Sequence, residues 1–468
     1  MKSSRILLFI GLAILLLGLT CAFYPDGGVN VGNLNVHFPT LTKILNPQRQ
    51  LDVEAYLAQQ DSLEAVMKTK QDSLAHYRHQ MDSSDIRFWF PNNDDRFFDN
   101  LFAQMESARR DGRTIRVVHY GDSQIESDRM SRRLRTYLQG NFGGGGPGLV
   151  PFATLIPTLA VSTYGTGSLV HQSPFGDSTV VRAGGNYGPM VQDWRVNGSA
   201  SSTITAATHK SCDKRLYKFS NFKMIFNNRP GPLSVHFADR KGSYVDDQTC
   251  EEEGVHAMSW RLDSATTSVS ISVSGTADIY GIMVDDGAGV AVDNVPLRGC
   301  SGHQFTQINQ DQLAAAYSHM DVGLIILQFG GNSVPYLKGQ KSIDAYCESM
   351  GAQIDRMHKC CPKAKILFIG PSDMSTRENG DLRSYGCIPQ LIASLQATAN
   401  NHGAAYWSIY HAMGGLNSMV AWVNQGLSGP DYVHFTTRGV DIMGDRLAKA
   451  FDNMYHIYKM RKEVDNAQ

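Results

Sequence analysis

The chain has 468 residues, of which 42% are hydrophobic and 19% charged, a balance that excludes a disordered or fibrous chain and predicts two or three globular domains. Lys and Arg number 43 against 44 Asp and Glu, so the net charge of -1 provides no global basic field and argues against nucleic-acid binding. A polytopic membrane protein is excluded as well, because the one long apolar stretch lies at the N-terminus.

The N-terminal segment predicts export from the cytosol. Lys2 and Arg5 precede an apolar run at 6–19, which is the pattern of a secretory signal. Because apolar residues continue to position 24, the stretch is also just long enough to span a bilayer. Residues 1–24 are therefore interpreted as a signal peptide or an N-terminal anchor, with lipid attachment at Cys21 as a third alternative. All three place the rest of the chain outside the cytosol.

Residues 25–90 are interpreted as a linker and an amphipathic helix. The stretch 25–45 is rich in Gly and Asn and is expected to be irregular. From 52 to 81, apolar residues recur at threes, fours and sevens, which predicts a helix. We expect a spacer helix that lies on the following domain, and a coiled-coil dimer seam is the alternative.

An α/β domain is predicted in two parts, 91–150 and 294–468. In the first part a strand at 114–120 (TIRVVHY) is followed by a tight turn and a helix. In the second part strands and helices alternate; the strands are expected at 323–329, 365–370 and 404–409, and the helices at 342–357, 387–401 and 437–458. This alternation predicts a parallel sheet that is flanked by helices on both faces.

Residues 151–293, between the two parts, carry no helical periodicity. Short β-branched runs are separated there by Gly, Asn and Asp, and they lie at 178–181, 202–206, 233–237, 267–272 and 278–284. The pattern is typical of a β-sandwich or jelly roll, which we interpret as a domain inserted after the first βα unit. Its aromatic residues belong either to its core or to a sugar-stacking surface; they are Tyr164, Tyr187, Trp194, Tyr217 and Trp260.

The eight cysteines are expected to be small buried residues with at most one or two disulfides. Spacing alone fixes no connectivity, but Cys212 and Cys250 are the favoured pair because both lie in the β-rich segment. The adjacent Cys360 and Cys361 are not a CxxC motif, and no His cluster with metal-ligand spacing stands beside them. No metal site is therefore expected.

Short polar motifs, here called polar islands, lie at the ends of predicted strands or in loops, where the binding and active sites of open α/β sheets are usually found. Ser123 follows the first strand at a turn into a helix, which exposes its hydroxyl near the positive end of that helix. Asp431 and His434 precede the last helix, at a spacing that lets the carboxylate hold one ring nitrogen while the other faces a nucleophile. The Asn332 amide and the Gly299 backbone N–H can both donate to an oxyanion.

In the order Ser, Gly, Asn, Asp and His, these islands resemble the SGNH/GDSL hydrolase family of esterases. The resemblance implies an SGNH-type, flavodoxin-like parallel sheet. It also implies a serine esterase in which Ser123 is the nucleophile, His434 the base and Asp431 the residue that orients the base. The Ser123 N–H, the Gly299 N–H and the Asn332 side chain would form the oxyanion hole.

The sequence departs from the pattern of that family at two positions. Gln124 follows the Gly-Asp-Ser turn where Leu is usual, and Ser333 follows Asn332 where Asp is usual. In addition, Gly302 is an alternative to Gly299 as the oxyanion glycine.

A narrower resemblance follows from the order of the domains. An exported SGNH domain with a β-sandwich inserted after its first block is similar to the peptidoglycan O-acetylesterases, in which the insertion resembles a carbohydrate-binding module. The opening VVHYGDSQIESDRM is also similar to exported proteins of Gram-negative bacteria, which implies a periplasmic enzyme, either soluble or anchored at its N-terminus. The implied partner is an acetylated glycan such as peptidoglycan or another polysaccharide.

The implied reaction is acyl transfer to water, which needs neither a metal nor an organic cofactor. An O-acetyltransferase with the same triad is an alternative, because a sugar hydroxyl can replace water as the acceptor. A catalytically inactive glycan-binding protein and a lipase or lysophospholipase are the others. Membrane contact is expected only through the N-terminal segment.

Overall fold

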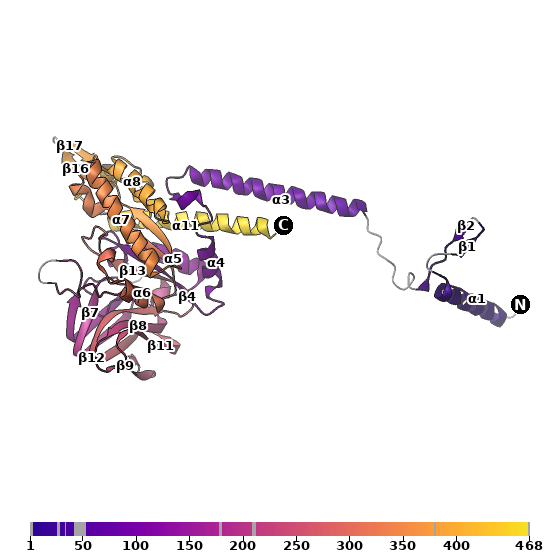
Figure 1. Ribbon diagram of the computed structural model, residues 1–468, viewed down its shortest axis with the longest axis horizontal. Helices are drawn as coiled ribbons and strands as arrows, with labels where there is room; N and C mark the ends of the chain where they lie inside the picture. The colour runs from indigo at the N-terminus through magenta and orange to yellow at the C-terminus, as the bar shows by residue number, and fades with distance from the viewer. Residues whose placement is uncertain are drawn as a thin grey trace. The chain divides into compact units, whose positions relative to one another are not determined.

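The computed structural model describes residues 3–25, 29–32, 34–41, 53–176, 180–207, 212–378 and 381–466 (Figure 1). The chain divides into two compact units, 1–73 and 74–468. The long helix α3 (Val53–Asp82) crosses the boundary between them.

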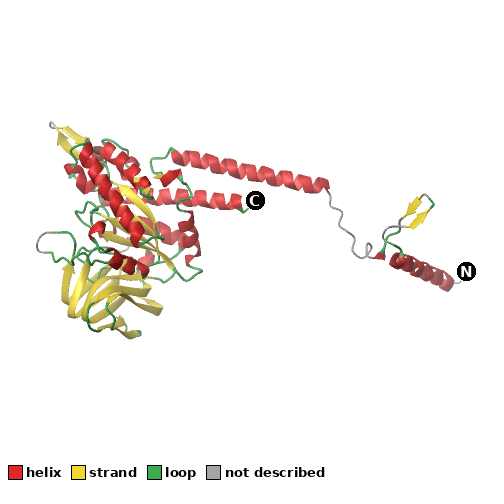
Figure 2. Ribbon diagram, in the orientation of Figure 1, coloured by secondary structure: helices red, strands yellow, loops and turns green. Residues whose placement is uncertain are grey.

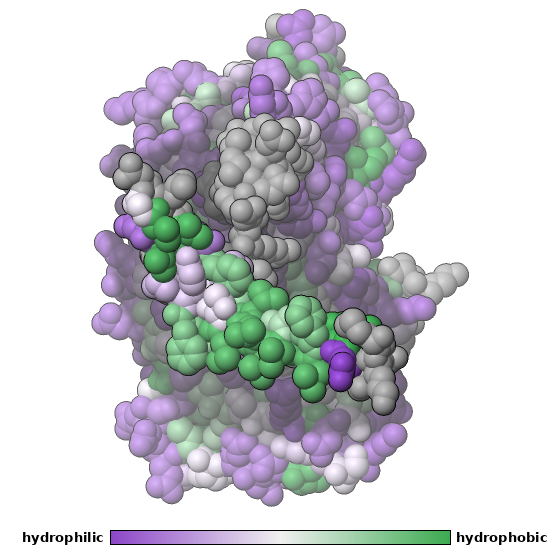
Figure 3. Space-filling model, turned by 90° about the vertical axis from the view of Figure 1, so that its right-hand side faces the viewer, coloured by the Kyte–Doolittle hydropathy of each residue, from purple (hydrophilic) through white to green (hydrophobic). Residues whose placement is uncertain are grey.

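The first unit begins with α1 (Ser3–Phe23), the one helix in the described residues that is long and apolar enough to span a membrane. Its apolar side chains are largely exposed, and they form the green band nearest the viewer in Figure 3. The strands β1 (Val29–Val31) and β2 (Leu34–Val36) then form an antiparallel hairpin. The sequence predicts irregular chain in this segment. The hairpin forms instead because Val and Leu alternate with Asn on both sides of Gly32, which is the pattern of paired strands.

The C-terminal part of α3 belongs to the second unit and packs on α11 (Thr437–Asp465). Leu74 is buried, and the Tyr77 hydroxyl donates a hydrogen bond to Asn453 Oδ1 at 3.2 Å. The Tyr77 ring also meets His456 edge-on, with the ring centroids 4.8 Å apart. These contacts hold the C-terminal part of α3 on the α/β domain.

The sheet of the α/β domain has six strands in the order β13-β4-β14-β15-β18-β3. Their bounds are β3 (Phe88–Trp89), β4 (Thr114–Gly121), β13 (Gly289–Pro296), β14 (Val322–Gln328), β15 (Lys365–Gly370) and β18 (Ala405–Ser408). All neighbours pair in parallel except β3, which runs antiparallel to β18 at the edge. The five parallel strands thus have the order 2-1-3-4-5, which is the order of the flavodoxin-like sheet that the resemblance implies.

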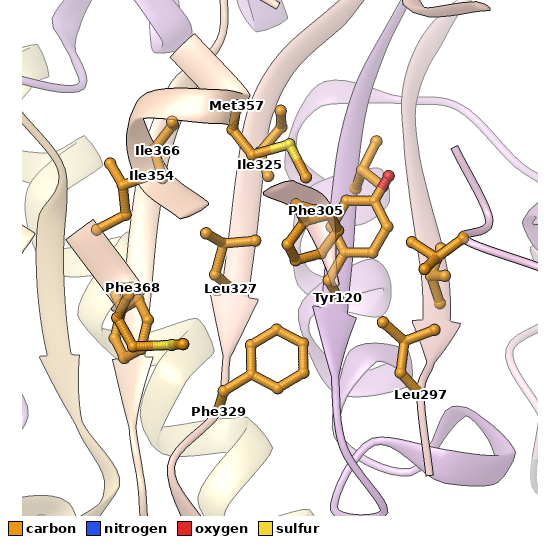
Figure 4. Close-up of a cluster of buried hydrophobic side chains, with 14 of the residues drawn as sticks. Tyr120, Leu297, Phe305, Ile325, Leu327, Phe329, Ile354, Met357, Ile366 and Phe368 are labelled. Atoms are coloured by element: carbon orange, nitrogen blue, oxygen red, sulfur yellow. The ribbon is translucent and has the colours of Figure 1, made fainter. Parts of the chain in front are cut away.

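Helices cover both faces of this sheet (Figure 2). One face packs on α6 (Gln310–Ser318), α7 (Gln340–Cys360) and α8 (Ile388–Asn401), and the other on α4 (Asp99–Ala108), α5 (Ser131–Phe142) and α11. Alternate residues of β14 point to opposite faces, so that Ile325 and Leu327 join the first core and Leu324 and Ile326 the second. Figure 4 shows the first of these cores.

The β-rich region is an eight-stranded antiparallel arrangement that extends below the α/β sheet (Figure 2). Its strands are β5 (Gly148–Val150), β6 (Val161–Gln172), β7 (Asp193–Ala206), β8 (Phe219–Asn228), β9 (Leu233–Asp239), β10 (Val245–Cys250), β11 (Gly254–Thr266) and β12 (Ser268–Asp285). The first half of β12 pairs with β9 and its second half with β8, while β7 pairs along most of its length. The expected β-sandwich insertion is therefore present, and aromatic residues such as Trp260 and Phe237 stack in its core.

Several sequence-derived strand bounds differ from the structure. The runs at 267–272 and 278–284 belong to the single strand β12, because Gly275 continues the strand at a φ of +136° where a side chain would meet Pro232 O. Of the strand predicted at 178–181, residues 178 and 179 lie outside the described residues, and Val181 forms an isolated bridge with Gln172. Most of β13 lies in the segment predicted as sandwich, but the strand belongs to the parallel sheet. The prediction is wrong here because an apolar β-strand sequence does not show which sheet the strand will join.

The sandwich and the α/β domain share one hydrophobic core. Tyr187 and Tyr280 of the sandwich belong to the same buried cluster as Tyr120 and Phe305. The Tyr120 hydroxyl also donates to Pro189 O at 2.5 Å. The insertion is thus not a separately packed module.

The favoured Cys212–Cys250 disulfide is wrong, because all eight cysteines are free thiols. The Cys212 thiol donates to Leu159 O at 3.2 Å, close to where β6 begins, whereas Cys250 ends β10. Because β6 and β10 stand at opposite edges of the same strand path, the two thiols cannot meet. Cys21, Cys300, Cys347, Cys360 and Cys361 are buried, as expected for small apolar residues.

Candidate active site

Ser123 lies at the tip of a tight turn directly after β4. Asp122 Oδ1 accepts the backbone N–H of Gln124 at 2.9 Å, which closes the turn around Ser123. A short 3₁₀ turn follows at Glu126–Asp128, and α5 begins only at Ser131. The expected long helix directly after Ser123 is therefore displaced along the chain, so its positive end does not stand at the serine.

Ser123, His434 and Asp431 form a chain of hydrogen bonds. Ser123 Oγ lies 2.8 Å from His434 Nε2, and His434 Nδ1 lies 2.7 Å from Asp431 Oδ2. The backbone N–H groups of Val433 and His434 both donate to Asp431 Oδ1 at 3.1 Å. The structure thus brings Ser123 to two side chains that lie more than 300 positions later in the sequence.

The carboxylate of Asp431 is set to remain ionised. Burial alone would raise its pKa, but the hydrogen bonds from the His434 ring and from the backbone N–H groups lower it below its ordinary value. An ionised Asp431 keeps the proton of His434 on Nδ1, so that Nε2 is free to accept the proton of the Ser123 hydroxyl.

Asn332 and Gly299 lie at the same pocket as the serine. The Asn332 amide donates to Cys300 O at 3.0 Å and to Asp122 Oδ2 at 3.3 Å. Gly299 is exposed, with a φ of +76° and open space where a side chain would stand. Gly302 is packed instead, since a side chain there would lie 2.9 Å from Phe329 and 3.0 Å from Met350. The geometry therefore favours Gly299 over Gly302 as a backbone donor.

Asp122, for which the sequence indicates no role, holds both the serine turn and the Asn332 amide. Its carboxyl is buried, and burial raises its pKa to about 6, although the Gln124 N–H and the charge of His434 pull in the opposite direction. The signal for this role was its place inside the Gly-Asp-Ser turn, where a buried carboxyl needs partners.

Gln124 and Arg129, also without a role in the sequence analysis, tie the serine turn to the histidine loop. The Gln124 amide donates to Val433 O at 2.8 Å, and the Arg129 guanidinium donates to Phe435 O. The departure from Leu at position 124 is thus explained, because the longer polar side chain holds the backbone beside His434. No single-sequence signal separated these two residues from ordinary surface polar groups.

These residues surround a pocket of about 560 Å³, within the usual size range of ligand sites. Its lining includes Ser123, Arg129, Arg298, Gly299, Asn332 and His434. Within the described ranges, no three His, Cys, Asp or Glu side chains are grouped to hold a metal ion.

Comparisons with known proteins show what parts of the chain are similar to. The sequence model of the GDSL-like Lipase/Acylhydrolase family matches residues 263–442, a range that contains Gly299, Asn332, Asp431 and His434. None of the curated proteins matches the chain in sequence.

Among solved structures, one described as "Peptidoglycan O-acetylesterase in action, 5 min" is 20% identical, covers 77% of this chain and 96% of that chain, and has a TM-score of 0.62. Family two carbohydrate esterases from Cellvibrio japonicus and Clostridium thermocellum are each 8% identical with a TM-score of 0.26, which is too low to carry an argument. They cover 64% and 62% of this chain, respectively, and 99% of their own. Residues 263–442 are therefore similar to the GDSL-like lipase/acylhydrolase family, and the fold of the chain is similar to that of the first solved structure.

Proposed function

We propose that the protein is an exported serine esterase that removes acetyl groups from peptidoglycan or another polysaccharide. The observation that carries the proposal is the hydrogen-bonded chain from Ser123 through His434 to Asp431 at a ligand-sized pocket. The family match supports hydrolysis of a carboxylic ester.

In the proposed mechanism, His434 Nε2 takes the proton of Ser123 as the serine oxygen attacks the ester carbonyl. The carbonyl oxygen becomes an oxyanion that accepts from the backbone N–H groups of Ser123 and Gly299 and from the Asn332 amide. The 3.3 Å bond from Asn332 to Asp122 is the longer of its two, and it is the one that the oxyanion would replace. His434 then protonates the leaving alcohol and activates the water that releases the acyl group.

The choice of a glycan substrate rests on the fold and on the insertion. The similar solved structure is titled as a peptidoglycan O-acetylesterase, and it covers 77% of this chain. Export is supported by α1, which has the length and apolar character of a signal or an anchor. The two together favour a substrate outside the cytosol.

The test compares acetate release from O-acetylated peptidoglycan, acetylated xylan and a short nitrophenyl acetate, with the Ser123→Ala variant as the blank. We expect release from the small ester and a higher kcat/KM on one of the two polymers, because remote contacts contribute most for large substrates. A folded protein that releases acetate from none of the three would contradict the proposal. Acetyl transfer to an added sugar acceptor in place of release would point to the acyltransferase alternative.

A further inference from the structure

A second cavity, of about 340 Å³, lies between the sandwich and the α/β domain. One wall comes from β5, the loop after it and the first residues of β7, and the other from the 3₁₀ turn after Ser123 and from the end of β13. Arg298 lines both this cavity and the catalytic pocket, and its Nε stands 3.7 Å from Glu126 Oε1. The two cavities are therefore immediate neighbours, with the exposed Arg298 side chain between them.

The walls of this interdomain cavity are mainly apolar. Leu155, Ile156 and Met190 line it together with the half-buried ring of Trp194. The Trp194 N–H already donates to Ala153 O at 2.9 Å, so the ring offers a ligand its apolar surface rather than a donor.

A buried carboxyl group lies among these apolar walls. Asp193 is 2% exposed. When the Gln172 amide is oriented so that its NH₂ group faces the two carboxyls beside it, this group donates to Asp193 Oδ1 at 2.8 Å and to Asp278 Oδ1 at 3.1 Å. Its Oδ2 is buried without a hydrogen-bond partner among the described residues. Burial and the charge of Asp278 raise the pKa of Asp193 to about 8, so at neutral pH it carries a proton that it can donate.

Two further polar side chains, His171 and Gln192, line the same cavity. His171 Nε2 and Gln192 Oε1 are 3.0 Å apart, and the His171 ring meets Trp194 with the centroids 5.3 Å apart. The cavity thus combines an aromatic ring and aliphatic walls with a small number of polar groups, which is the usual composition of a small-molecule site.

We propose that the interdomain cavity binds a second sugar ring of the same glycan whose acetyl ester lies at Ser123. A sugar ring presents a C–H face that packs on Trp194 and a rim of hydroxyls that satisfies the free oxygen of Asp193. An alkyl chain would instead offer that oxygen no hydrogen-bond partner. This inference rests on the proposed function, and it assigns a substrate subsite to the sandwich.

The test measures binding without turnover, in the Ser123→Ala background, by calorimetry. The probes are a tetrasaccharide of the peptidoglycan glycan, stripped of peptide and acetyl ester, and xylotetraose. Trp194→Ala should weaken binding of the preferred probe at least tenfold, and Asp193→Ala should weaken it by about the same factor. The matched control is Tyr164→Ala, which removes a 70% exposed aromatic from the same sandwich at a position outside the cavity and should change Kd less than twofold.

Three outcomes would overturn the inference: neither probe binds, Trp194→Ala binds as tightly as its parent, or the Tyr164→Ala control carries the loss. A fourth is a selective loss of octanoyl ester hydrolysis in otherwise active Trp194→Ala enzyme, which would make the cavity an acyl-chain site. The Asp193→Asn variant keeps the shape of the side chain and an N–H donor in place of the carboxyl O–H, so it should retain binding of the probe. Retained binding in Asp193→Asn together with lost binding in Asp193→Ala would show a contact with the sugar rather than a folding defect. Because binding is measured without Ser123, its result is independent of whether the wild-type enzyme releases acetate.

Discussion

The catalytic pocket and the interdomain cavity share Arg298, yet they hold their polar groups in opposite ways. In the catalytic pocket, loops at the carboxyl ends of parallel strands join Ser123, His434 and Asp431 in a connected hydrogen-bond chain. In the interdomain cavity, antiparallel strands supply apolar walls and leave one oxygen of Asp193 unpaired. The side chains of the first pocket are thus preorganised for proton transfer, whereas the second cavity has an unpaired oxygen that can form a hydrogen bond with a ligand.

The buried carboxyls of Asp122 and Asp193, one in each cavity, differ in their pKa values. Burial raises the pKa of Asp122 to about 6, with the Gln124 N–H and His434 limiting the rise. Burial raises the pKa of Asp193 further, to about 8, because the neighbouring carboxylate of Asp278 adds to the effect. The same residue type is thus tuned by whether its neighbours donate hydrogen bonds or repel its charge.

The largest expected effect is that of Ser123→Ala. It should lower kcat for a small acetyl ester by about 10⁴-fold or more, because no other group on the pocket supplies the nucleophile. The thermal midpoint should stay close to that of the parent, since Asp122 rather than the serine hydroxyl closes the turn. Substantial turnover by the purified variant would move the chemistry away from this pocket.

Asn332→Ala should have the next largest effect, a loss of about 10²–10³ in kcat with a smaller change in KM. An oxyanion donor acts mainly on the transition state, so its removal changes turnover more than binding. Steady-state kinetics on the small ester measure both constants. A change restricted to KM would make Asn332 a binding residue instead.

The two carboxyls should affect stability over different pH ranges. A carboxyl with a raised pKa binds its proton more tightly in the native than in the unfolded state, so its contribution to stability falls as pH rises between the two values. Asp122→Asn should therefore gain stability relative to the parent between about pH 4 and 6, on the order of 1–3 kcal/mol. The neighbouring charges of Asp193 are Asp278, Arg195 and Arg229. The Asp193→Asn variant should gain stability relative to the parent over a wider range, from about pH 4 to 8.

Urea unfolding of the parent and of the two variants at pH 4, 6, 8 and 9 measures these differences. Above about pH 6 the Asp122→Asn difference should be flat, while the Asp193→Asn difference should continue to grow. Identical pH profiles for the two variants would show that the two carboxyls are not set apart as the structure indicates.

The smallest expected effects distinguish Gly299 from Gly302. Gly302→Ala should cost about 1–3 kcal/mol in the free energy of unfolding, because its new methyl group meets Phe329 and Met350. Gly299→Ala has open space around it and should cost only about 1 kcal/mol of backbone strain at its positive φ. Chemical denaturation compares the two, and a larger loss at Gly299 would reverse the packing argument.

Much of the fold could be predicted because the relevant patterns are local. The alternation of buried strands with amphipathic helices indicates a parallel sheet flanked by helices, and the structure has such a sheet. The residues proposed as the triad are polar groups that follow a strand or precede a helix, and the ends of parallel strands converge at such positions. Asp122, Gln124 and Arg129 were given no role because theirs depend on partners far away in the sequence.

The disulfide prediction failed for the same reason. Cys212 and Cys250 are close in sequence and lie in one β-rich segment, but strand order separates them to opposite edges. The sheet that β13 joins was likewise decided by its pairing with β4 rather than by its composition.

The sequence by itself determined the class of the fold, the order of the site residues and the presence of a β-rich insertion. These depend on residue periodicity and on turn chemistry, which act over a few positions. Only the tertiary structure decided that Ser123 meets His434, that the sandwich shares a core with the α/β domain, and that Asp193 has an unpaired oxygen beside Trp194. Those features arise from contacts between distant segments, whose energies depend on burial and on which partner each polar group finds, and neither can be read along a single chain.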